Sequence, residues 1–170
     1  MFKNQLLHYR TTSALKGNQS LRASIPYKQA LTVGILFSVE DKPKHDAIKE
    51  FIKQLQLDGK KVSVLEYLPK QKDNYEFLFD FFTIKDLSFW GKINSPYAEK
   101  FIATPFDYLF CLDRESNPLI QNLLARSKAK CRIGKFSKSD HAYYELMIEQ
   151  QNGSVRNLID SMYKYAKQLR

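Results

Sequence analysis

Acidic side chains follow two apolar segments of the sequence, where they could take part in catalysis. Asp41 comes shortly after the apolar segment 30–38, and Asp113 ends a second one, 106–113. If these segments are neighbouring strands, both aspartates lie at the same sheet edge, where a carboxylate pair can act as acid and base or hold a metal. The structural alternative is helix capping, because acids at a helix N-terminus are stabilising.

A basic cluster lies further along the chain. The segment SKAKCRIGKFSK, residues 127–138, has five basic side chains and no acid. With the residue before it, this segment predicts an anion-binding patch, because Lys and Arg neutralise phosphates. The candidate residues are Arg126, Lys128, Lys130, Arg132, Lys135 and Lys138. A solvated sheet margin would explain the same charges.

The two cysteines, Cys111 and Cys131, are predicted to be reduced core residues. Each lies in a predicted strand, and two cysteines do not suggest a disulfide framework. Strand alternation turns Cys131 inward and its neighbours Lys130 and Arg132 toward solvent. Because a cysteine nucleophile needs a nearby base and a lowered pKa, we expect neither thiol to be reactive.

The sequence lacks the usual patterns of metal and nucleotide sites. His8, His45 and His141 are far apart in the chain, and no CxxC or HxxxH spacing is present, so no metal site is predicted. The segment after 30–38 has neither GxGxxG nor GxxxxGK[ST], so no cofactor is predicted. These observations favour a protein without catalytic activity.

From residue 30 onward, predicted strands and helices alternate, and these elements must position the candidate residues. Apolar and β-branched segments predict strands at 30–38, 60–69, 77–82, 106–113, 129–136 and 143–150. Helical spacing of apolar residues predicts helices at 42–59, 96–103, 117–127 and 154–169. This order predicts a single three-layer α/β domain over 30–170, with a Rossmann-like or flavodoxin-like, mostly parallel sheet.

Residues 1–29 form a basic arm that we expect to be partly helical. Residues 1–39 carry five basic side chains and no acid, in a chain of net charge +9. Such an arm could bind nucleic acid, an anionic membrane surface or an acidic protein partner. Alternatively, Phe2, Leu6 and Tyr9 dock it on the domain as a helix with its charges in water, or it is a transit peptide.

Two further features bear on function and location. Phe89 and Trp90 precede Gly91 and could form a lid over the sheet end or a ligand platform, although such aromatic residues more often pack in a core. No apolar segment approaches the roughly 20 residues that cross a bilayer, and the start lacks the apolar region of a secretory signal. A cytoplasmic protein without a transmembrane segment is expected.

Two resemblances to known families follow from longer motifs. FDYLFCLDRESNPLIQNLLARSKAKCRIGKF, residues 106–136, resembles the first domain of ADP-heptose lipopolysaccharide heptosyltransferases. That family has Gly-Asp after its first strand, where this chain has Ser38-Val39-Glu40-Asp41, and it needs a second domain, so the resemblance implies fold rather than glycosyl transfer. VGILFSVED, LSFWGK and AKCRIGKF followed by YYELMIEQ resemble an uncharacterised bacterial family of small α/β proteins.

The sequence therefore predicts a non-catalytic cytoplasmic α/β domain that binds an anionic partner, RNA or a ribonucleoprotein. The alternative is a small-molecule-binding or degenerate glycosyltransferase-like enzyme domain that uses Asp41 and Asp113 at the carboxyl edge of the sheet. A third possibility is docking of the basic arm on a membrane surface or a protein.

Overall fold

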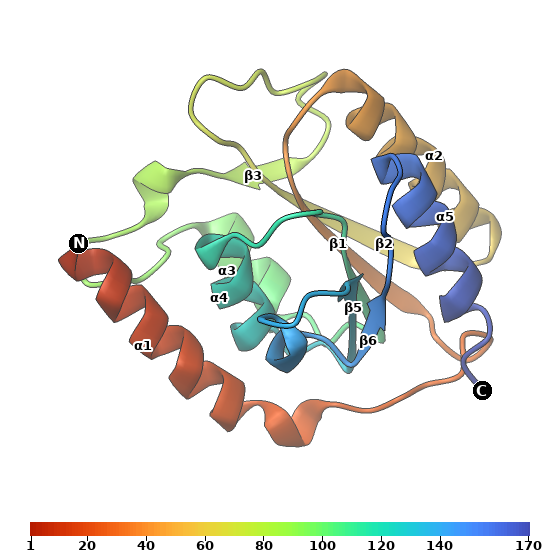
Figure 1. The fold of residues 1–170 in the computed structure, drawn as a ribbon, viewed down its shortest axis with the longest axis horizontal. Helices are drawn as coiled ribbons and strands as arrows, with labels where there is room; N and C mark the ends of the chain where they lie inside the picture. Colours follow the sequence, from red (N-terminus) through yellow and green to blue (C-terminus); the bar gives the residue numbers. More distant parts are fainter.

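A computed structural model describes residues 1–170, and it contains a six-stranded sheet covered by helices on both faces (Figure 1). The strands are β1 (Thr32–Ser38), β2 (Lys61–Tyr67), β3 (Asp80–Phe82), β4 (Tyr108–Cys111), β5 (Cys131–Lys135) and β6 (Leu146–Ile148). The helices are α1 (Phe2–Gly17), α2 (Lys42–Leu57), α3 (Pro96–Ala103), α4 (Pro118–Arg126) and α5 (Val155–Ala166). Short 3-10 helices are η1 (Gln19–Leu21), η2 (Ile84–Asp86) and η3 (His141–Tyr143).

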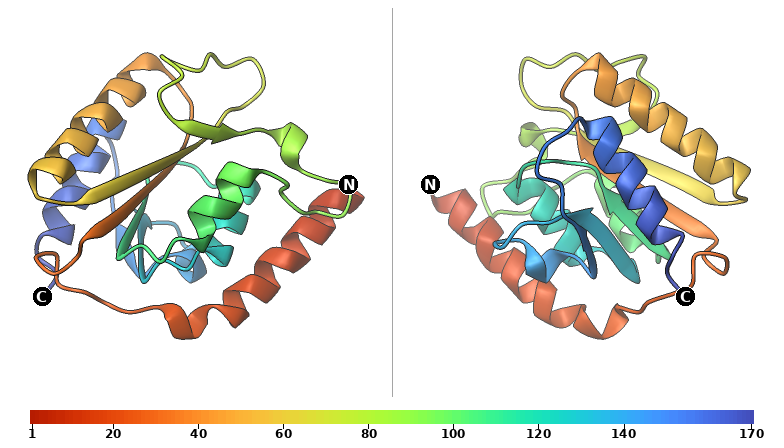
Figure 2. Two further views of the ribbon diagram at one scale, coloured as in Figure 1. Left: turned by 180° about the vertical axis from the view of Figure 1, so that it is seen from behind. Right: turned by 45° about the vertical axis from the view of Figure 1, so that its right-hand side comes forward.

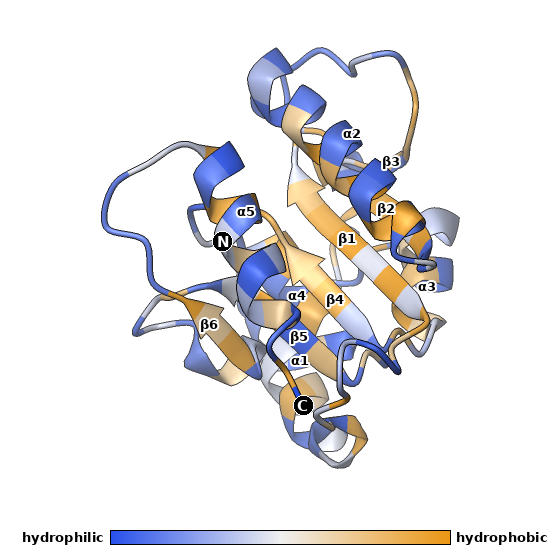
Figure 3. Ribbon diagram, turned by 90° about the vertical axis from the view of Figure 1, so that its right-hand side faces the viewer, coloured by the Kyte–Doolittle hydropathy of each residue, from blue (hydrophilic) through white to orange (hydrophobic).

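The strand order is β3-β2-β1-β4-β5-β6, and every neighbouring pair is parallel. This is the Rossmann order rather than the flavodoxin-like one. The predicted three-layer α/β fold is therefore confirmed, and the two fully apolar strands, β1 and β4, are central neighbours as expected. Figure 3 shows β1 and β4 side by side in the sheet, each containing hydrophobic residues.

Local sequence signals explain where several helices begin and end. The side chains of Asp41, Ser95 and Asn117 cap α2, α3 and α4, and a proline follows each cap within two residues. Gly59 adopts a φ of +80° just after α2, a conformation that only glycine takes without strain. These short-range signals explain why the predicted helices appear close to their expected bounds.

Two apolar cores lie on the two faces of the sheet. α2 and α5 cover one face around Ile48, Phe51 and Leu158, while α3 and α4 cover the other around Phe101 and Leu123. Figure 2 shows α1 on the outside of the second layer, where it packs against α4. No helix is both long enough and apolar enough to span a membrane.

α1 is attached to the domain by residues other than those predicted. Phe2 and Tyr9 are largely exposed, whereas Leu7 and Thr11 are buried against α4. The Nδ2 of the fully buried Asn122 donates to the Thr11 hydroxyl at 2.9 Å. The predicted docking was therefore wrong for Phe2 and Tyr9, whereas Leu6 is partly buried beside Gly91, because the face that α1 turns inward is set by where α4 and this glycine lie.

Glu66 of β2 is a buried carboxylate with an unsatisfied oxygen. Its side chain is 2 % exposed, and its Oε1 has no hydrogen-bond partner. Burial raises the pKa of Glu66 to about 7. In the unfolded chain the carboxyl loses its proton near its ordinary pKa, so the folded state binds more protons between these two values. The contribution of Glu66 to stability therefore falls as pH rises from about 4.5 to above 7.

Glu66→Gln removes this ionisation without changing the side-chain shape. The stability advantage of the variant over the wild type should be about 2 kcal/mol larger at pH 8.5 than at pH 5.5. Urea unfolding at both pH values measures the difference. Glu149→Gln, at an exposed position, is the matched control and should show no such gain. An equal advantage of Glu66→Gln over the wild type at both pH values would show that ionised Glu66 is solvated.

Candidate functional site

The switch point of the sheet, between the carboxyl ends of β1 and β4, is where folds of this kind usually bind ligands. Here it is occupied by a buried ion-pair network. The Lys44 ammonium donates to Asp113 Oδ1 at 2.9 Å and to Glu40 Oε1 at 3.1 Å. Asp113 also accepts from the backbone N–H and the hydroxyl of Ser38, both at 2.7 Å. The lysine side chain is 1 % exposed, so it fills the crevice from within.

The structure does not form the predicted catalytic pair from Asp41 and Asp113. Asp41 is exposed and caps α2 by accepting from the Lys44 N–H at 2.9 Å. Asp113 is buried and bonded to Lys44 and Ser38. Both aspartates therefore have structural partners. For Asp41 that partner is the N-terminus of a helix, the structural alternative to a catalytic role.

The predicted outward orientation of Arg132 is wrong. Its guanidinium is 4 % exposed, donates to Glu145 Oε1 at 2.7 Å and also reaches the carbonyl of Leu124. Alternation placed this residue on the face opposite Cys131 correctly, but that face is covered by α4 and η3 rather than by water. Arg132 is a buried structural cation and is not available to an external anion.

The other members of the predicted basic patch are spread over different surroundings. Lys130 pairs with Asp107 at 2.9 Å, and Lys135 donates to the carbonyl of Arg114. Lys128 and Lys138 are exposed. Arg126 lines a hollow with Arg10 and Lys92, although it also pairs with Glu99 at 2.6 Å, and Lys135 lines a different one with Arg114. The segment is therefore not one continuous patch.

Both cysteines are core residues, as predicted. Cys111 and Cys131 are buried and carry free thiols. Burial raises the pKa of each to about 12, so almost no thiolate exists at neutral pH. The glycine of the same segment also has a packing role, since a Cβ on Gly134 would lie 2.3 Å from the ring of Tyr144.

A basic hollow of about 300 Å³ lies between α1, the end of α4 and the turn after η2. We call it the α1 hollow, and its principal lining residues are Tyr9, Arg10, Ser13, Lys92, Asn122 and Arg126. Three of these six are cations and none is an acid, so the hollow favours an anion. It joins one cation of the basic arm, Arg10, to one of the predicted patch, Arg126.

Two exposed aromatic rings stand beside this hollow on a tight turn, residues 88–92, which we call the aromatic turn. Phe89 is 62 % exposed and Trp90 is 64 % exposed, and their ring centroids are 5.4 Å apart. The turn closes through a 2.9 Å hydrogen bond from the Ser88 N–H to the Lys92 carbonyl. Both rings are exposed, so the expectation that such residues pack in a core is wrong here, and a role as a ligand platform stays a prediction.

The aromatic turn is held rigidly against α1. Gly91 has a φ of +69°, and a Cβ there would lie 2.5 Å from the Leu7 nitrogen, so only glycine fits. Arg10 Nε donates to the Trp90 carbonyl at 3.0 Å. Figure 1 shows the segment after β3 reaching the N-terminal end of α1. The backbone that carries both rings is therefore held against α1.

Sequence reasoning identified parts of this surface without joining them. It selected Arg126, the basic arm and the Phe89-Trp90 pair separately, but it missed Lys92 and the role of Tyr9. These residues come from segments about 80 and 115 positions apart, and no periodicity links them. The one available signal was Gly91 directly after two large aromatic residues, which marks a turn rather than a core segment.

A family model described as "Family of unknown function (DUF6913)" matches residues 3–169, nearly the whole chain. No curated protein matches the sequence.

Proposed function

The chain belongs to this family of unknown function, and we propose that it is a non-catalytic cytoplasmic protein that binds single-stranded RNA, free or within a ribonucleoprotein. One observation carries the proposal: Arg10, Lys92 and Arg126 line the α1 hollow, no acid is among its lining residues, and the exposed rings of Phe89 and Trp90 lie directly beside it. Cations that track a phosphate backbone and aromatic rings that stack on bases are the two components of single-strand binding.

The geometry favours a single strand over a duplex. Stacking on Trp90 or Phe89 needs an unpaired base whose face is free, and a duplex keeps its bases stacked on one another. The contacts from the three cations would reach phosphates, which carry no sequence information. We therefore propose binding with little sequence preference and with strong dependence on salt.

The alternative of a degenerate glycosyltransferase-like enzyme has less support. It needs Asp41 and Asp113 free at the carboxyl edge, whereas Asp41 caps α2 and Asp113 is bonded to Lys44 and Ser38. Removing Lys44 from Asp113 would leave a buried charge without its cation, so the network does not open without a cost in stability.

Trp90 is the single tryptophan of the chain, so its fluorescence reports directly on the proposed site. Titration with an oligouridylate of roughly ten nucleotides should quench its emission, because a stacked base contacts the exposed indole. Trp90→Ala should weaken binding of a labelled oligouridylate about 5-fold to 100-fold, the loss expected for one stacked base. Phe136→Ala, at another exposed aromatic residue, is the matched control and should bind as the wild type does.

The same titration separates RNA from other anionic partners. Vesicles that contain phosphatidylserine should leave Trp90 emission unchanged, and a duplex RNA of equal length should bind more weakly than the single strand. Vesicle binding with a blue shift of the emission, in the absence of an RNA response, would instead identify α1 and the aromatic turn as a membrane contact and refute the proposal.

A further inference from the structure

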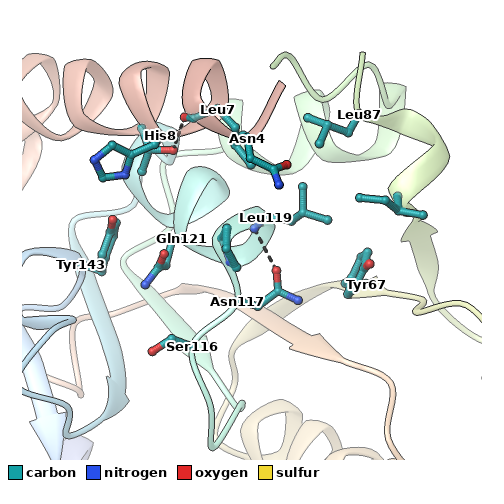
Figure 4. A pocket seen from close by; sticks show the side chains of 13 residues that line it. Asn4, Leu7, His8, Tyr67, Leu87, Ser116, Asn117, Leu119, Gln121 and Tyr143 are labelled. Atoms are coloured by element: carbon teal, nitrogen blue, oxygen red, sulfur yellow. Dashed lines mark hydrogen bonds between the residues drawn. The ribbon is translucent and has the colours of Figure 1, made fainter. Parts of the chain in front are cut away.

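A second cavity lies on the other side of α1, at the carboxyl edge of the sheet. Its volume is about 440 Å³, within the range of small-molecule sites. α1, the N-terminus of α4 and the end of β2 form its walls. Figure 4 shows Asn4 and His8 of α1 on one side and Asn117 and Gln121 on the other. This cavity and the α1 hollow have no lining residue in common, although different residues of α1 line each of them.

The lining contains no Asp, Glu, Lys or Arg. Apolar side chains, among them Leu7, Leu87 and Leu119, supply much of the wall. A charged ligand would lose its hydration here without gaining an opposite charge, which is costly. The cavity therefore favours an uncharged molecule.

Several polar groups in this lining have no partner within the protein. Tyr67 is 9 % exposed as a residue, and its hydroxyl makes no hydrogen bond within the protein but is not fully buried. The side-chain amide of Asn4 is also unpaired. Asn117 uses its Oδ1 to accept from the Leu119 N–H at 2.8 Å, which leaves its amide N–H groups free. Gln121 donates from Nε2 to Asp140 at 2.8 Å, which leaves its Oε1 free.

These groups define the chemistry of a matching ligand. The free amide N–H groups of Asn117 and the free Oε1 of Gln121 offer a donor and an acceptor, the two kinds of group that pair with the edge of an adenine. Tyr67 and Tyr143 add aromatic surface together with hydroxyl groups. The Tyr67 hydroxyl is left to water when the cavity is empty, so a bound molecule that hydrogen-bonds to it would take the place of that water.

We propose that this cavity binds a free, uncharged, adenine-like heteroaromatic molecule, a nucleobase or a nucleoside. The inference is independent of RNA binding at the α1 hollow, because it rests on different residues on another side of α1.

Calorimetric titration with adenosine tests the proposal. Wild-type protein should bind adenosine, and the 9-riboside of purine-6-carboxylate, in which a carboxylate replaces only the exocyclic amine, should bind at least about tenfold more weakly. Tyr67→Phe keeps the ring and should lower adenosine affinity about threefold to tenfold, the loss of one hydrogen bond. Asn4→Trp, at an exposed position of α1, should fill the cavity and abolish binding while the protein stays folded.

Three results would overturn the inference: an adenosine Kd weaker than about 1 mM, equal binding of the carboxylate, or unchanged binding by Asn4→Trp. The Asn4→Trp variant also shows whether the cavity holds a free molecule or a base that belongs to bound RNA. Asn4→Trp should keep the wild-type affinity for oligouridylate and for oligoadenylate, since the cavity takes a free molecule. A loss of affinity for either strand would show that the cavity holds a base of bound RNA, against the proposal.

Discussion

Lys44→Met will lower the free energy of unfolding by about 3 to 5 kcal/mol. The ammonium is 1 % exposed and lies 2.9 Å from Asp113, whose side chain is 6 % exposed. Methionine retains most of the side-chain volume but leaves the Asp113 carboxylate buried without its cation. A buried charge that has lost its partner is far more costly than a lost surface contact. Urea unfolding at pH 7 measures the change.

Two further variants show whether the uncompensated charge is the cause. Lys42→Met breaks an exposed pair in the same turn of α2, with Asp46, and should cost less than about 1 kcal/mol. In Lys44→Met/Asp113→Asn the remaining charge is gone, while the asparagine Oδ1 can still accept from Ser38. The double variant should regain at least half of the loss. A double variant as unstable as the sum of both single variants would mean that the two residues do not interact.

Replacing Arg10, Lys92 and Arg126 together by Gln will weaken binding of a single-stranded oligouridylate by about 100-fold at low salt. The estimate assigns about 1 kcal/mol to each lost charge-assisted contact. All three side chains line the α1 hollow, whose lining contains no acid, although Arg126 also pairs with Glu99. Fluorescence anisotropy of a labelled oligonucleotide measures the affinity.

The substitutions should leave the fold intact. Arg10 is exposed, and its removal breaks one hydrogen bond, to the Trp90 carbonyl. Arg126 loses the ion pair with Glu99, whose side chain is 43 % exposed, and such surface pairs contribute little. A thermal melt near that of the wild type should accompany the loss of affinity. Wild-type affinity in a folded triple variant would exclude the α1 hollow as the RNA contact.

Much of the fold could be predicted from local signals. Asn117 followed by Pro118 starts α4, and Ser95 followed by Pro96 starts α3, because cap chemistry depends only on neighbouring residues. The continuous apolar segment at 30–38 identified a central strand, since only a strand covered on both faces has that composition. Strand order within the sheet needed the structure, which distinguishes the Rossmann arrangement from the flavodoxin-like one.

The candidate site was harder to predict, because long-range packing decides it. Alternation along β5 sets the face on which Arg132 lies. It does not show that Glu145, thirteen residues later, pairs with Arg132 on that face and that the guanidinium is buried there. Likewise, nothing in the local sequence of Lys44 shows that it is buried, because its partner Asp113 follows β4, far along the chain. The α1 hollow combines three segments, so its charge could not be read from any one of them.

The dependence of RNA affinity on salt tests the proposed function most directly. The triple variant should be compared with a matched variant that loses the same charge elsewhere, Lys53, Lys61 and Lys164 replaced by Gln, all at exposed positions. In a plot of log affinity for oligouridylate against log salt, the first variant should reduce the magnitude of the slope by about 2, and the matched variant by less than about 0.5. Equal reductions by both variants would show that diffuse charge, and not the α1 hollow, binds the strand.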